Sequence, residues 1–356
     1  RSEEPAYVFA GGVIAGGFLQ IAFQLPFLRK QGMPWKPGLS LRDPAVRKVG
    51  KLMIPGIFGV GVYQINFAIS RIMASGLEEG SVSALYYASR VEELTLGLFS
   101  IALSIVLLPT FSEQVAEQDL EGMKKTLRFS FGLVFLVSLP ALAGLLVLSR
   151  PIIQVLFERG LFTGQSTATS ASCLFYFALG LPFISGVKIL APAFYSLKDT
   201  KTPMVIAILV MLSCIGLSLV LMSSLRVGGI ALAISLSQII NLVFLVVYLE
   251  KKVGSIGKKD ILGSALRSGL CAAVMGAAVW LLAKLWAGRL MSFAAQAIAL
   301  LGTIVLGIAV YAGISFFFNR QDLRSLKIAF SPGKIFREKD AEKQFLSPRI
   351  DNEFQG

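Results

Sequence analysis

The stretch VSALYYASRVEELTLGLFSIALSIVLLPT, residues 82–110, decides the fold class, because it is long and apolar enough to cross a membrane as a helix. A bilayer core of about 30 Å needs roughly 20 mostly apolar residues in an α-helix. Eight further stretches of this kind flank it, at 7–28, 52–74, 129–148, 168–195, 203–224, 228–250, 264–288 and 291–318. Each is expected to be helical, since an open strand edge leaves backbone groups unpaired in lipid. The sequence therefore predicts an all-α, polytopic membrane helix bundle with nine spans.

The composition agrees with a membrane protein and argues against several other classes. The 356 residues are 55% hydrophobic and 15% charged, and the net charge of +13 comes from cations between the apolar stretches. No single basic face is present, so a nucleic-acid partner is not expected. The chain has no histidine, and Cys173, Cys214 and Cys271 lie far apart inside apolar stretches. The missing histidine excludes His-dependent zinc sites and Ser-His-Asp triads. The cysteine positions give no disulfide framework and no metal-ligand spacing. We therefore expect no metal, no cofactor and no enzymatic activity.

Lysine and arginine alternate between the two sides of the predicted membrane. The loops after the first, third, fifth and seventh stretches carry Arg29, Lys30, Lys36, Arg42, Arg47, Lys48, Lys51; Lys124, Lys125, Arg128; Lys198, Lys201; and Lys251, Lys252, Lys258, Lys259. The other loops hold only Arg150, Arg159, Arg226 and Arg289. Positive loops stay in the cytoplasm. The pattern predicts Arg1 outside and the polar tail, 319–356, inside, with a short amphipathic helix at 151–162 on the outer surface.

Charged side chains inside the spans are the candidate functional residues, because burying them in lipid is costly. At 100° per residue, one narrow face of 82–110 carries Ser83, Tyr86, Arg90, Glu93, Gly97, Ser100 and Ser104. Arg90 is about five turns from the inner end, so a water-accessible cavity on this face is the natural explanation. Glu93 is placed at i,i+3 for an ion pair. The alternative is that this pair only orients the helix.

Two other spans add weaker candidates. The second carries Tyr63, Gln64, Asn66, Ser70 and Arg71 within half a turn, and the fifth places Ser185, Lys188, Pro192 and Tyr195 on one face. Arg71 lies close to the outer end of its span, so snorkelling to headgroups is an equal alternative. Lys188 lies about two turns from the inner end of its span, and snorkelling is a serious alternative there too. Cations outnumber acids inside the spans, which favours an anionic substrate. Arginine suits phosphate because its planar fork binds two oxygens. A cation-coupled drug exporter would instead need a buried carboxylate.

Two motifs resemble the MurJ/MviN lipid II flippase family. They are ASGLEEGSVSALYYASRVEELTLGLFSIALSIVLLPTFSE (74–113) and LAPAFYSLKDTKTP (190–203). The resemblance implies a fourteen-helix protein of the MOP exporter superfamily, of which these are the last nine helices. It implies a bacterial inner-membrane flippase that moves the undecaprenyl-pyrophosphate-linked peptidoglycan precursor to the outer leaflet by alternating access. Residues 1–47 would then hold the last N-terminal-lobe helix and a cytoplasmic loop, 48–318 the eight-helix C-terminal lobe, and 319–356 a cytoplasmic tail.

The resemblance also implies roles for individual residues. Arg90 matches a cavity arginine, Glu93 an acid at the lateral portal, and Lys188 a basic position. Arg71 matches the arginine of an Asp-Arg pair whose acid is replaced by Ser70, and acids that bind sodium in some members are absent here. The expected substrate site comprises Arg90, Glu93, Tyr86, Arg71, Lys188, Gln64 and Asn66. The last two spans resemble a pair that forms a groove for the polyprenyl tail.

Partners implied by the resemblance are lipid II or a related glycolipid, membrane phospholipids and cell-wall synthesis proteins. The membrane potential or an ion gradient would supply energy. The alternatives are a flippase for another polyprenyl-linked glycan such as O-antigen, a drug exporter, and a non-transporting scaffold that gathers cell-wall enzymes. A scaffold has no need for Arg90 and Glu93 on one deep polar face, so substitution there would be silent.

Overall fold

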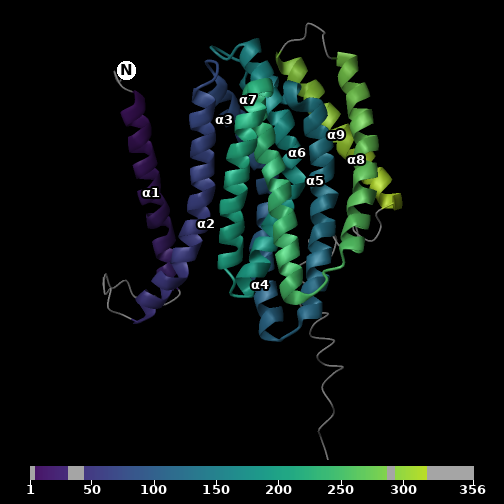
Figure 1. Ribbon diagram of the computed structural model, residues 1–356. Helices are drawn as coiled ribbons and strands as arrows, with labels where there is room; N and C mark the ends of the chain where they lie inside the picture. Colours follow the sequence, from purple (N-terminus) through teal and green to yellow (C-terminus); the bar gives the residue numbers. More distant parts are fainter. Residues whose placement is uncertain (1–4, 31–43, 287–292, 319–356) are drawn as a thin grey trace, which may run out of the picture. The chain divides into compact units, whose positions relative to one another are not determined.

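The computed structural model describes residues 5–30, 44–286 and 293–318, which form helices and short connections without any strand in these ranges (Figure 1). The predicted tail 319–356, the loop cations Lys36 and Arg42, and Arg289 lie outside the described residues. The chain divides into two compact units, Arg1–Ile54 and Pro55–Gly356. The first holds α1 (Pro5–Lys30) and the start of α2 (Pro44–Ser75). Large apolar side chains along α1, such as Phe18 and Phe23, are exposed, as expected of a helix in lipid.

The second unit holds the rest of α2 and the remaining helices. In chain order they are α3 (Ser81–Leu96), the π-helical segment η1 (Gly97–Ile101), α4 (Ala102–Ala116), α5 (Leu120–Phe157), α6 (Gly164–Ser196), α7 (Lys201–Val253), α8 (Lys258–Trp286) and α9 (Phe293–Phe318). By length and composition, seven helices in the described part of the chain can cross a membrane. The third predicted span is α3, η1 and α4 joined end to end.

Helix α7 contains two of the predicted spans. Its 53 residues would extend about 80 Å at 1.5 Å per residue, which is far more than a bilayer core. Arg226 interrupts it with non-helical angles, φ 51° and ψ −133°. The predicted spans 203–224 and 228–250 are therefore its two halves. With α2 as the second span, each of the nine predicted stretches is helical wherever the structure describes it, and the predicted all-α membrane fold is confirmed.

The separate amphipathic helix predicted at 151–162 is wrong. Residues Pro151–Phe157 continue α5, and only the residues after Phe157 form the connection to α6. Pro151 lacks an amide hydrogen but does not end the helix, because neighbouring helices hold this segment in place. Ile153, for example, is fully buried against the core of the second unit.

Helix α6 lies at the centre of the second unit, where it packs against α3, α4, α5 and α7, while α8 and α9 pack on the α5 side. Small residues permit this close approach. A side chain at Gly180 of α6 would meet Ser235 of α7 at 2.8 Å. The Ser235 hydroxyl donates a hydrogen bond to the Tyr176 carbonyl oxygen at 2.7 Å, which ties the two helices together.

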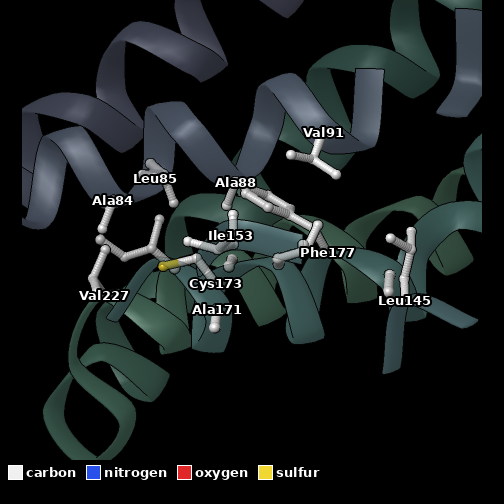
Figure 2. Close-up of a cluster of buried hydrophobic side chains, with 14 of the residues drawn as sticks. Ala84, Leu85, Ala88, Val91, Leu145, Ile153, Ala171, Cys173, Phe177 and Val227 are labelled. Atoms are coloured by element: carbon white, nitrogen blue, oxygen red, sulfur yellow. The ribbon is translucent and has the colours of Figure 1, made fainter. Parts of the chain in front are cut away.

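The buried face of α3 fixes the direction of its polar face. Ala84, Ala88 and Val91 of α3 pack against Phe177 of α6 and Ile153 of α5 in one hydrophobic cluster (Figure 2). The polar residues predicted on the other side of α3 are thereby directed away from this core.

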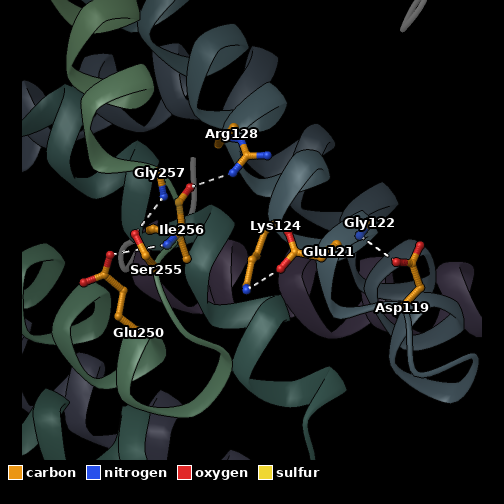
Figure 3. Close-up of polar contacts among 9 residues, drawn as sticks. All are labelled: Asp119, Glu121, Gly122, Lys124, Arg128, Glu250, Ser255, Ile256 and Gly257. Atoms are coloured by element: carbon orange, nitrogen blue, oxygen red, sulfur yellow. Dashed lines mark hydrogen bonds and ion pairs between the residues drawn. The ribbon is translucent and has the colours of Figure 1, made fainter.

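The connections α4–α5, α6–α7 and α7–α8 are tied together at one end of the second unit. Arg128 Nη1 donates to the Ile256 carbonyl oxygen at 3.4 Å, and Asp119 caps α5 by accepting from the Gly122 amide at 2.8 Å (Figure 3). Lys252 of α7 forms an ion pair with Asp199 at 2.8 Å. These connections are the ones in which the sequence concentrates lysine and arginine.

Candidate functional site

Arg90 and Glu93 form the ion pair that the sequence predicted. Arg90 Nη1 lies 2.6 Å from Glu93 Oε2, with the two side chains 47% and 41% exposed within the described structure. An intrahelical pair this open contributes well under about 1 kcal/mol to stability. Both side chains keep part of their surface free of contacts with the described helices.

Tyr86 brings a second arginine to this pair. The Arg90 Cζ lies 4.7 Å from the centroid of the Tyr86 ring, and the Arg71 Cζ of α2 lies 5.8 Å from the same centroid. Arg71 also lies 4.6 Å from the Phe67 ring centroid. Cations within about 6 Å of an aromatic ring are attracted to its face. We call Arg71, Tyr86, Arg90 and Glu93 the arginine cluster; it unites four of the seven predicted site residues.

The other three predicted site residues lie outside the arginine cluster. Gln64 is exposed on α2. Asn66 lines a small polar cavity and has a buried Oδ1 with no hydrogen-bond partner among the described residues. Lys188 is half-buried on α6, one turn after Ser185, whose hydroxyl accepts a hydrogen bond from Ser100 of η1 at 2.9 Å. In the described residues no carboxylate lies within 4 Å of Lys188.

Glu92 is a candidate that the sequence interpretation left out. It lines the same cavity of about 40 Å³ as Asn66, between α2, α3, α6 and the second half of α7. The other polar residues around this cavity are Tyr63, Ser89, Glu93, Ser235 and Gln238. The volume is enough for water. The periodicity of α3 alone places Glu92 off the polar face, and only the polar residues of the neighbouring helices reveal its environment.

A large apolar pocket lies on the other side of the same helix. It has a volume of about 630 Å³ and is formed mainly by α5, α8 and α9. Its lining includes Leu136, Pro140, Leu145, Met275, Val279, Ile304, Ile308 and Tyr311, and it reaches α3 at Thr95. Thr95 is two residues after Glu93. Helix α3 therefore carries Arg90 and Glu93 on one face and borders the apolar pocket of about 630 Å³ with a different face.

A family model described as lipid II flippase MurJ matches residues 1–300. The chain belongs to the lipid II flippase MurJ family. The resemblance seen in residues 74–113 and 190–203 is thereby confirmed. Membership and the many apolar helices together make the chain a polytopic inner-membrane protein.

Three relatives illustrate the extent of the MurJ match. The probable lipid II flippase MurJ of Vibrio cholerae is 37% identical over 88% of this chain and 60% of its own length. The probable lipid II flippase MurJ of Haemophilus influenzae is 36% identical over 79% of this chain and 56% of its own length. The lipid II flippase MurJ of Burkholderia cenocepacia is 34% identical over 70% and 49%. The chain thus spans between about half and six-tenths of the length of these relatives.

Solved structures support the same assignment. A lipid II flippase MurJ in an inward closed conformation superposes with a TM-score of 0.65 at 28% identity, covering 80% of this chain and 57% of that chain. A MOP superfamily transporter from Pyrococcus furiosus superposes with a TM-score of 0.51 at 20% identity, covering 79% and 67%. The second likeness concerns the fold alone, and it agrees with the predicted MOP-type architecture.

Proposed function

We propose that this chain is part of a flippase that carries lipid II, the undecaprenyl-pyrophosphate-linked peptidoglycan precursor, from the cytoplasmic to the outer leaflet by alternating access. The observation that carries the proposal is the pairing on α3 of the arginine cluster with the apolar pocket. Such a surface suits an amphiphile with an anionic phosphate group and a long apolar tail. The names of the MurJ relatives favour lipid II over another polyprenyl-linked glycan.

Arg90 and Arg71 are the proposed ligands of the pyrophosphate. Phosphate oxygens accept paired hydrogen bonds from a guanidinium group and are stronger acceptors than water. When the cargo binds, its phosphate oxygens would replace the Glu93 carboxylate as the partner of Arg90, because the ion pair is partly exposed. When the cargo leaves, Glu93 would take Arg90 back, so that an unpaired arginine need not persist in the cavity. Tyr86 holds both guanidinium groups near one ring.

Lys188, Gln64 and Asn66 complete the proposed cavity lining. Lys188 would add positive charge from α6, while the two amides of α2 would offer donors and acceptors to the sugar and peptide of the headgroup. The apolar pocket between α5, α8 and α9 would take part of the polyprenyl tail, since its volume of about 630 Å³ falls in the range of ligand pockets.

We further propose the orientation that the loop charges predict, with residues 319–356 in the cytoplasm. In this orientation the membrane potential favours outward movement of an anion, by about 2.3 kcal/mol per charge at 100 mV. The proposal is transport without a bound cofactor, in which residues 1–47 supply the last helix of the N-terminal lobe and a cytoplasmic loop, and residues 48–318 form the C-terminal lobe. The further proposed partners are membrane phospholipids and cell-wall synthesis proteins.

Substitution of Arg90 tests the proposal. Arg90→Ala in the full-length protein should abolish growth of cells depleted of their own lipid II flippase, because the pyrophosphate loses its main ligand. Arg90→Lys should also be impaired, since a lysine cannot make the paired contact. Immunoblotting of membranes checks that each variant inserts. Normal growth with Arg90→Ala would contradict transport through this cluster and favour a scaffold.

A further inference from the structure

An open groove lies at the end of the second unit where the α2–α3 and α5–α6 connections meet. Its volume is about 910 Å³. It is at the opposite end of α5 from the connections of Figure 3, and so on the outer side in the proposed orientation. The volume is within the upper range of small-molecule sites and well above that of a single monosaccharide. We call it the outer groove.

Three aromatic rings gather at one wall of the outer groove. The ring centroid of Tyr87 lies 4.7 Å from that of Phe157 and 5.2 Å from that of Phe162, and the two phenylalanine centroids are 6.1 Å apart. All three side chains are half-buried and line the groove. Phe157 and Phe162 pack with one edge against the hydrophobic core. Their remaining ring surface borders the groove, whose lining also includes polar side chains and Leu161, and such a surface suits the C–H face of a sugar ring.

Polar groups surround these rings. Ser83, Gln165, Ser166 and Thr169 line the outer groove, together with Ser170. Ser170 is 0% exposed, and its hydroxyl has no hydrogen-bond partner among the described residues. A buried hydroxyl without a partner costs about 1–3 kcal/mol. A ligand hydroxyl or amide that reached Ser170 would remove this cost, so the residue points to an occupant that can hydrogen-bond.

The charges of the outer groove have both signs. Glu78 forms an ion pair with Arg226, the residue that interrupts α7. Glu79 is exposed and pairs with no cation within 4 Å in the part of the chain that the structure describes. Arg159 donates to the Leu156 carbonyl oxygen at 3.1 Å and lines the groove nearby. The exposed Glu79 disfavours a pyrophosphate here, whereas a ligand that carries both an amine and a carboxylate would find a group of opposite charge for each, at Glu79 and Arg159.

We propose that the outer groove binds the peptide-bearing saccharide headgroup of the cargo after it has crossed the membrane. A sugar ring would lie on Tyr87, Phe157 and Phe162, with hydroxyl or amide groups bonded to Ser170 and Gln165. The amine and carboxylate of the peptide would meet Glu79 and Arg159. This inference rests on the proposed function and orientation, and it adds a second headgroup site that does not use the pyrophosphate.

The test measures binding of a water-soluble disaccharide-pentapeptide, which lacks the pyrophosphate and lipid, to the full-length protein in nanodiscs by calorimetry. Phe162→Leu, which keeps an apolar side chain but removes the ring, and Glu79→Gln should each weaken binding about tenfold. The matched controls are Phe175→Leu on an exposed part of α6 and Glu117→Gln at the other end of the unit, which should stay within twofold. Thermal unfolding midpoints check that the variants are folded.

Two further arms identify the source of the ligand and separate this inference from the proposed function. Lipid II added to the nanodisc should displace the soluble headgroup if the site receives cargo. Arg90→Ala should leave headgroup binding within twofold while abolishing growth. Absence of saturable binding, unchanged affinity in both groove variants, or no displacement by lipid II would overturn the inference and leave the arginine cluster unaffected. Normal growth with Arg90→Ala would instead contradict transport through the cluster, whatever the groove binds.

Discussion

Tyr86 has two guanidinium groups near its ring, and at the scale of single residues this contact distinguishes the arginine cluster from an ordinary surface ion pair. The face of α3 that carries Tyr86, Arg90 and Glu93 was predictable from helical periodicity, because all three residues lie on one element. Glu92 was not predictable in this way. Its cavity depends on Asn66 and Gln238, which are far from it in the sequence and come together only through packing.

Removing the ring should therefore weaken cargo binding without removing a charge. Each cation–π contact contributes about 0.5–1 kcal/mol, so Tyr86→Leu should reduce lipid II affinity roughly five- to thirtyfold if both contacts are lost. Tyr86→Phe keeps the ring and should stay within about threefold. Binding of lipid II to the full-length protein in nanodiscs measures both. Equal affinities for the leucine and phenylalanine variants would mean that the ring does not position the arginines.

At the scale of elements, helix existence followed from apolar length, but helix ends and interruptions depended on tertiary packing. Residues 151–157 join α5 because the bundle holds them, although their amphipathic pattern suggests a separate helix. The π-helical turn at Gly97–Ile101 interrupts the third span, where Ser100 bonds to Ser185 of α6. The outer groove was likewise not predictable, since it is assembled from two connections between which residues 81–157 intervene.

The α6–α7 connection should give a pH-dependent component of stability. Burial is the largest single influence on Asp199 and opposes ionisation, but the combined interactions with Lys252 and Thr202 outweigh it and lower the pKa of Asp199. Because the folded-state pKa is the lower one, this contribution is present above the unfolded pKa of about 3.9 and is lost as pH falls through the folded value. Asp199→Asn should lower stability at pH 7 by on the order of 1–2 kcal/mol.

Thermal unfolding of the full-length protein in detergent from pH 7 to pH 3 measures this component. The wild type should lose more stability than Asp199→Asn in the acid range, so that the two midpoints converge below about pH 4. Glu121→Gln is the matched control. The Lys124 ammonium, mainly through a hydrogen bond, lowers the pKa of Glu121, but this side chain is fully exposed and should matter little. A constant gap between wild type and Asp199→Asn at every pH would contradict the assignment.

At the scale of the whole molecule, the described helices place the three basic connections after α4, α6 and α7 together at one end and the outer groove at the other. The arginine cluster lies on α2 and α3 in the same unit as the apolar pocket of α5, α8 and α9. In the proposed function, this distribution would offer each chemical part of an amphiphilic cargo a site within one unit. The nine spans and their loop charges could be read from the sequence because both are local properties of the chain.

The most direct test of the central claim is the amount of lipid II accessible on the outer face of living cells. Cells depleted of their own flippase would carry the full-length protein as wild type, as Arg90→Ala, or with the control Glu117→Gln, and a reagent confined to the outside would cleave exposed lipid II. We predict that wild type and Glu117→Gln restore cleavage and that Arg90→Ala leaves lipid II protected although it inserts normally. Full cleavage in the Arg90→Ala cells would contradict the account.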